Sequence, residues 1–149
     1  MNEPLHIIVD TREQRPWAFP RGLVQVKRGT LLSGDYALSG DHNFTIERKS
    51  LADFVGSVTS GWQRLTNEFE RMDEAKFPAK IIILEGTFGD ILNESYEHSK
   101  VRPKLVIKKI AMLSLMGVAV LFTNNAHEAA GLALGIFRER EKQLTEDIL

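Results

Sequence analysis

Two side chains in the first half of the sequence, Glu47 and Lys49, are separated by a single residue. The segment 45–49 is predicted to be a β-strand, on which side chains alternate between two faces. Glu47 and Lys49 are therefore expected on one face and Arg48 on the other. A carboxylate can bind a divalent ion through oxygen, the ligand that Mg²⁺ prefers. A lysine can position or help to deprotonate an attacking water, or offset charge on a phosphate, so the pair suits hydrolysis of a phosphodiester bond.

A metal site needs a second acid, and two residues are candidates. Asp35 stands at the start of a short predicted strand, across a turn from the segment 45–49, and is the better placed. Asp10 ends the apolar run 7–9 and is the other candidate. Gly34 is expected to be required for the turn that leads into Asp35.

Each of these residues also has an ordinary structural explanation. An acid and a lysine two positions apart are often only the solvated face of a strand. Asp53 lies in the first turn of a predicted helix, where capping and the helix dipole favour an acid in any protein. Arg48 could serve as a salt-bridge partner that holds the acids together. A functional site is favoured because these acids gather with Arg12 and Glu13 at strand ends and turns.

The elements that would position these residues follow from apolar periodicity. Strands are predicted at 7–10, 23–27, 36–38, 44–49, 81–84 and 118–122, and helices at 51–58, 62–72, 103–116 and 126–143. The early strands are expected to form an antiparallel meander. The run 81–84 is apolar throughout, which is typical of a strand covered on both faces. Strands followed by alternating helices and strands predict an α/β fold with a central mixed sheet flanked by helices.

Composition excludes several classes of protein. The chain has 149 residues, of which 43% are hydrophobic and 26% charged, as in a globular domain. It has no cysteine, which excludes disulfides and thiolate metal sites and favours an intracellular, cytoplasmic location. No signal peptide is recognisable, and the apolar-rich segment 110–122 is too short to span a membrane. The four histidines are too scattered for a zinc site.

Contacts to a nucleic acid would have to be local, because a net charge of −1 does not provide bulk attraction to phosphates. Arg64 and Arg71 share a face of the second predicted helix and could follow a phosphate backbone. The alternative is an exposed face with an ion pair between Arg64 and Glu68. Trp62 could stack on a base or pack on the protein, whereas Trp17 is expected to cover the edge of the core.

The order and spacing of the motifs carry a resemblance to a known family. Gly34-Asp35, then Glu47-Arg48-Lys49, then Asp53 four residues after Lys49, is similar to the signature of the XPF-type nucleases. The segment 9–13, Val-Asp-Thr-Arg-Glu, also resembles the first motif of that family. The second half of the chain resembles the family more loosely.

The resemblance implies a restriction-endonuclease-like core and Mg²⁺- or Mn²⁺-dependent hydrolysis of DNA near flaps, forks or junctions, in repair or recombination. The catalytic residues that it implies are Asp10, Asp35, Glu47 and Lys49. The metal would be bound by Asp10, Asp35 and Glu47. The residues implied to support the site are Arg12, Glu13, Arg48 and Asp53.

The resemblance also bears on partners and domain organisation. Family members pair through their nuclease domains, and the segments 110–122 and 126–137 hold more apolar surface than one sheet face covers. We therefore expect a homodimer, with Leu132 and Ile136 at its interface. The family's helicase-like region and helix-hairpin-helix motifs are absent from 1–149, so a single nuclease domain is expected. The alternatives are a non-catalytic DNA-binding subunit, which usually loses the signature acids, or a scaffold in a repair complex.

Overall fold

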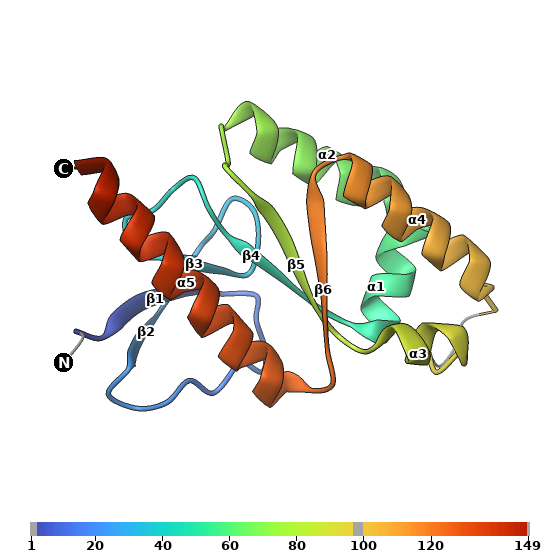
Figure 1. Cartoon of the computed structure of the whole chain (residues 1–149), viewed down its shortest axis with the longest axis horizontal. Helices are drawn as coiled ribbons and strands as arrows, with labels where there is room; N and C mark the ends of the chain where they lie inside the picture. The colour runs from blue at the N-terminus through green and yellow to red at the C-terminus, as the bar shows by residue number, and fades with distance from the viewer. Residues whose placement is uncertain (1–2, 97–99, 149) are drawn as a thin grey trace.

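The protein is built around one six-stranded sheet with helices on both faces (Figure 1). The computed structural model describes residues 3–96 and 100–148. The strands are β1 (Leu5–Asp10), β2 (Val24–Gly29), β3 (Tyr36–Leu38), β4 (Ile46–Ser50), β5 (Lys80–Glu85) and β6 (Val118–Thr123). The helices are α1 (Leu51–Val58), α2 (Trp62–Glu74), α3 (Phe88–Leu92), α4 (Pro103–Leu115) and α5 (Ala126–Ile148).

The strand order is β2-β1-β3-β4-β5-β6. β4, β5 and β6 run parallel, joined by helical crossovers, whereas β3 is antiparallel to both of its neighbours. This is the mixed sheet predicted from the sequence. The order places β1, β3 and β4 side by side, so residues that are distant in the sequence meet at adjacent strand ends.

The predicted antiparallel meander is wrong at its first two steps. β2 pairs with β1 in parallel, from Leu5 beside Val24 to Asp10 beside Gly29, and β3 pairs with β1 and not with β2. A tight turn would have forced antiparallel pairing, but the connection 11–23 is long enough to return the chain to the start of β1. The return is fixed by the hydrogen bond from the Leu5 amide to the Leu23 carbonyl, at 2.9 Å.

Two apolar cores lie on opposite faces of the sheet. On one face, α1, α2 and α4 pack against Ile82 and Leu84 of β5. On the other face, which α5 crosses in Figure 1, Ile83 packs with β1, β3, β4 and α5. β5 is thus covered on both sides, as its continuous apolar run predicts. Trp17 is only 4% exposed and stacks on Tyr36 with ring centroids 4.3 Å apart, which confirms that it covers the core.

Local sequence accounts for most helix boundaries. The Ser50 hydroxyl accepts a hydrogen bond from the Asp53 amide and starts α1 directly after β4. α3 was missed because five residues are too few for a periodic pattern, although Thr87 and Asp90 form a capping box. α5 runs beyond the predicted end at residue 143, and Leu144 in this extension packs against the core. Within residues 3–96 and 100–148, no helix has the length and hydropathy to cross a membrane.

Candidate active site

Three neighbouring strands bring the predicted acids to one region of the sheet. The Asp35 amide donates to the Ile46 carbonyl of β4, and the Asp10 amide donates to the Asp35 carbonyl, each at 2.9 Å. Asp35 is therefore held between the end of β1 and the start of β4. Glu47 is the second residue of β4, directly after Ile46. The fold thus places Asp35 and Glu47 together although eleven residues separate them in the chain.

The carboxylates of Asp35 and Glu47 lie in an environment that disfavours their charge. Burial raises the pKa of Asp35 to about 6, and the nearby carboxylates of Glu13 and Glu68 contribute to this rise. The hydrogen bond from the Arg48 amide and the charge of Lys49 oppose it. Burial also raises the pKa of Glu47 well above its usual value, with further contributions from Asp35 and Glu68. Such a pair would be stabilised by a bound cation.

Lys49 lies on the same face of β4 as Glu47, as strand alternation predicts. Its Nζ atom is 3.5 Å from Glu47 Oε1, and both side chains are largely buried. The main chain of the same strand orients the second acid, because the Arg48 amide donates to Asp35 Oδ2 at 2.8 Å. One short strand therefore contributes an acid, a base and the amide that fixes Asp35.

Gly34 is required by the turn before Asp35. Its φ angle is +78°, in the left-handed region that favours glycine. A Cβ atom at this position would lie 2.3 Å from Thr45 Oγ1. The Gly-Asp pair of the sequence motif is thus explained by the close approach of the turn to the segment that leads into β4.

Asp10 is fully buried, and its carboxylate is occupied by hydrogen bonds from the protein. Oδ2 accepts from the Arg12 amide at 3.1 Å and from Arg12 Nε at 2.6 Å, and Oδ1 accepts from the Leu31 amide at 2.9 Å. Burial alone would raise the pKa of Asp10, but these hydrogen bonds outweigh burial and lower it. In this structure Asp10 ties the end of β1 to the loop that precedes Gly34, and its role as a metal ligand stays a prediction.

Arg48 points away from Glu47 and Lys49, as predicted, and joins a second polar network. Its Nη1 is 3.1 Å from Glu13 Oε2, and its Nε is 2.6 Å from Glu85 Oε1. Tyr36 also donates to Glu13 at 2.8 Å, and the Trp17 indole donates to Glu85 at 2.9 Å. Arg48 therefore forms salt bridges with two acids, as its structural explanation predicts. Through Glu13 it fixes the loop after β1 to the sheet.

The three predicted DNA-contacting residues are not equivalent. Arg64 is exposed and lines a polar groove of about 650 Å³ between α1 and α2, together with Lys49, Asp53 and Glu68. Arg71 lines a different hollow, beside the loop that contains Ser33. Trp62 is half-buried, and Lys109 Nζ lies 4.2 Å from its ring centroid. Of these three residues, Arg64 is the one that shares a groove with Lys49.

The ion pair between Arg64 and Glu68, the alternative explanation for Arg64, is not found among the described residues. Glu68 Oε1 instead accepts from the Gly34 amide at 3.1 Å. A signal for this placement exists in the sequence. With Leu65, Phe69 and Met72, which are buried, Glu68 completes the i, i+3, i+4, i+7 pattern of a helix face turned towards the protein. A carboxylate within such a face needs a partner inside the fold.

A divalent ion fits part of the predicted ligand set. Across residues 3–96 and 100–148, no three Asp, Glu or His side chains lie close enough together to hold one ion, so the trio of Asp10, Asp35 and Glu47 is not assembled. Asp35 and Glu47 remain as two adjacent oxygen donors. Mg²⁺ is commonly bound by one or two carboxylates and completes its shell with water and substrate phosphate. The side chains present therefore suit a site of that kind.

Comparison with known proteins agrees with this geometry. The profile of the ERCC4 domain family matches residues 9–134. The structure of XPF from Aeropyrum pernix is similar, with a TM-score of 0.67 and 28% identity over 93% of this chain and 70% of that chain. XPF from Aeropyrum pernix in complex with DNA gives a TM-score of 0.68 and 25% identity over 93% of this chain and 66% of that chain.

A protein of Methanocaldococcus jannaschii, named as an ATP-dependent RNA helicase, is 30% identical over 142 residues. The match covers 93% of this chain but only 16% of that much longer protein. The family match covers most of the present chain and includes every residue of the candidate site. The chain therefore belongs to the ERCC4 domain family and has the restriction-endonuclease-like fold of an XPF-type nuclease domain.

Proposed function

We propose that this protein is a divalent-metal-dependent DNA endonuclease that acts inside the cell, near flaps, forks or junctions, in repair or recombination. The observation that carries the proposal is the convergence of Asp35, Glu47 and Lys49 on one region of the sheet. Lys49 Nζ is 3.5 Å from Glu47, and the Asp35 carboxylate is fixed by an amide of the same strand. The similar XPF structure in complex with DNA supports DNA as the substrate class.

The chemistry assigns separate tasks to these side chains. Asp35 and Glu47 would hold Mg²⁺ or Mn²⁺, which when bound supplies a Lewis acid next to the scissile phosphate. Lys49, beside Glu47, orients the attacking water or offsets charge on the phosphate as the water oxygen bonds to phosphorus and the leaving oxygen departs. Asp10, Arg12, Glu13 and Arg48 support this arrangement through the loops that they fix, and Asp53 lines the groove beside Lys49.

The groove between α1 and α2 is the proposed path for one DNA strand. It leads away from Lys49, and its polar lining includes Ser57, Gln63 and the exposed Arg64. Arg64 would contact a phosphate, which positions the strand without reading its sequence. Trp62 and Arg71 lie outside this lining and are assigned to more distant parts of the substrate.

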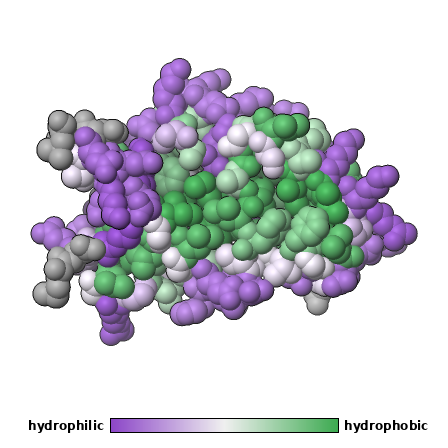
Figure 2. Space-filling model, in the orientation of Figure 1, coloured by the Kyte–Doolittle hydropathy of each residue, from purple (hydrophilic) through white to green (hydrophobic). Residues whose placement is uncertain are grey.

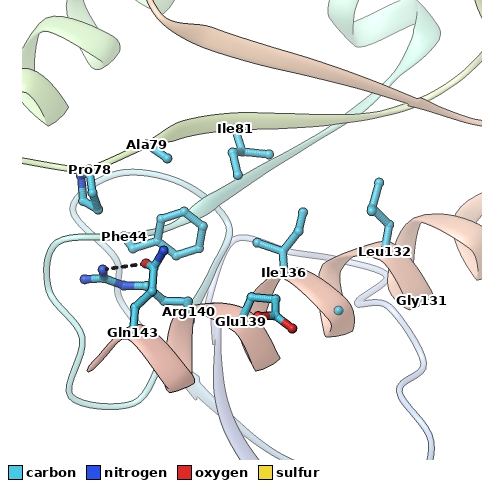
Figure 3. Close-up of a pocket in the computed structure, with 11 residues that line it drawn as sticks. Phe44, Pro78, Ala79, Ile81, Gly131, Leu132, Ile136, Glu139, Arg140 and Gln143 are labelled. Atoms are coloured by element: carbon cyan, nitrogen blue, oxygen red, sulfur yellow. Dashed lines mark hydrogen bonds between the residues drawn. The ribbon is translucent and has the colours of Figure 1, made fainter. Parts of the chain in front are cut away.

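A homodimer would supply a second DNA-binding surface. Apolar side chains gather over the face on which α5 lies (Figure 2). Within that face, a groove of about 460 Å³ runs between α5 and the start of β5. Ile136 of α5 projects across it towards Ile81, and Leu132 projects from the same side of α5 (Figure 3). We propose that the same groove of a second chain covers this surface, giving an interface between identical patches.

Cleavage of defined DNAs tests the proposed activity. Flap, fork, junction and linear duplexes are incubated with the protein in Mg²⁺, in Mn²⁺ and in a chelator. Cleavage should need the metal and favour branched DNA, and Glu47→Gln should abolish it. Glu70→Gln, which removes an exposed carboxylate from α2, is the matched control and should cut normally. Metal-independent cleavage would contradict the mechanism, and DNA binding without cleavage would favour the non-catalytic subunit.

A further inference from the structure

Glu68 has a place in the site that the motifs do not record. It lies on α2, yet its Oε1 atom accepts the Gly34 amide at 3.1 Å, across 34 residues of chain. Glu68 also lines the groove between α1 and α2 together with Lys49, the neighbour of Glu47 on β4. One side chain therefore holds the turn that carries Asp35 and borders the groove at Lys49.

The Gly34–Asp35 turn needs a restraint of this kind. Hydrogen bonds of the main chain hold it on the sheet side, from the Asp35 amide to Ile46 and from the Asp10 amide to Asp35. Thr45 leaves no room for a Cβ atom at Gly34, so the turn lies close against the segment before β4. The Gly34 amide points towards α2, where it donates a hydrogen bond to the side chain of Glu68.

We infer that Glu68 is a positioning residue, which fixes Asp35 beside Glu47 by binding the Gly34 amide directly before Asp35. This inference rests on the proposed function and adds a residue to it. The role requires an oxygen acceptor at the end of a side chain of this length, and it does not require a negative charge. Glu68 acts on the metal through its neighbours, as residues that orient metal ligands do.

Two substitutions separate reach from charge. Glu68→Gln keeps an acceptor for the Gly34 amide but removes the charge. Glu68→Asp keeps the charge but is one methylene too short to reach the Gly34 amide. Neither variant opens a large cavity, so both should fold, and thermal melting verifies this. Glu70→Gln again serves as the control on the exposed face of α2.

The measurements are the affinity for Mn²⁺ alone, by titration calorimetry, and the Mn²⁺ dependence of kcat and KM for DNA. Glu68→Asp should weaken Mn²⁺ binding by about tenfold or more and lower kcat with little change in KM. Glu68→Gln should stay close to wild type in both measurements. Equal loss in the two variants, loss in Glu68→Gln alone, or no loss in either would overturn the inference. Wild-type protein that binds no Mn²⁺ and cuts no DNA would instead refute the proposed function.

Discussion

Replacing Asp35 by asparagine should stabilise the metal-free protein while removing its activity. The folded state raises the pKa of this carboxyl from 3.8 to about 6. The folded protein thus binds the Asp35 proton more tightly than the unfolded chain does. The contribution of Asp35 to stability is fully present below pH 3.8 and is lost as the pH rises towards 6 and beyond. At neutral pH the charged side chain is therefore a cost to the folded state.

The size of that cost follows from the pKa change. A rise of about two pH units corresponds to roughly 3 kcal/mol, and we expect about 2 kcal/mol because the carboxylate keeps some contact with water. Asparagine has no charge to bury, and its side-chain oxygen can still accept the Arg48 amide. For a domain of this size, the gain corresponds to a melting temperature higher by roughly 5 °C.

The assay is thermal unfolding in chelator from pH 4 to pH 8. Asp35→Asn should melt above wild type at pH 8, and the difference should shrink towards zero at pH 4, where wild-type Asp35 is protonated. Glu70→Gln should follow the wild-type curve at every pH, because its carboxylate is exposed. Added Mn²⁺ should stabilise wild type more than Asp35→Asn. If Asp35→Asn has a melting temperature at or below that of wild type at pH 8, the charged Asp35 side chain does not destabilise the folded protein and the reasoning fails.

Three further predictions concern the turn, the second polar network and the dimer. Gly34→Ala should lower the free energy of unfolding in urea by roughly 3 kcal/mol, because its methyl group meets a buried side chain. Gly40→Ala, at a similar φ but in open space, should cost only about 1 kcal/mol, and equal costs would contradict the clash. Arg48→Met should lower the free energy of unfolding by about 2 kcal/mol in the same assay, because Glu13 and Glu85 lose their cationic partner. Wild-type stability would be the contrary result. In light scattering, Ile136→Asp should convert a dimer to a monomer, whereas Leu32→Asp, outside the groove, should not; a monomeric wild type would disprove the dimer.

Much of the fold follows from the sequence because its signals are local. The apolar run of β5, the serine before α1 and the glycine before Asp35 each specify their own structure with little help from distant contacts. Strand alternation likewise places Glu47 and Lys49 opposite Arg48. These statements needed only the geometry of a strand or a turn, and the structure agrees with them.

The rest depends on contacts between distant segments. Nothing in the residues of β2 shows whether this strand pairs with β1 in parallel or antiparallel. The hydrogen bond from the Leu31 amide to Asp10 depends on where the loop after β2 comes to rest. Glu68 looked like a surface residue because its neighbour Arg64 offered a simpler local partner. A polar residue on an apolar helix face indicates a partner inside the fold, even where an opposite charge lies one helical turn away.

The alternation along β4 divides two tasks between the two sides of one strand. Glu47 and Lys49 face the proposed reaction site, whereas Arg48 anchors the loop after β1 through Glu13 and Glu85. The proposed activity would therefore be lost by changes at 47 and 49 alone, without disturbing the architecture. Gene duplication followed by such changes would yield a silent copy that still folds and still presents the same surfaces. The same separation offers a practical tool, because a double variant at these positions could trap DNA for identification without cutting it.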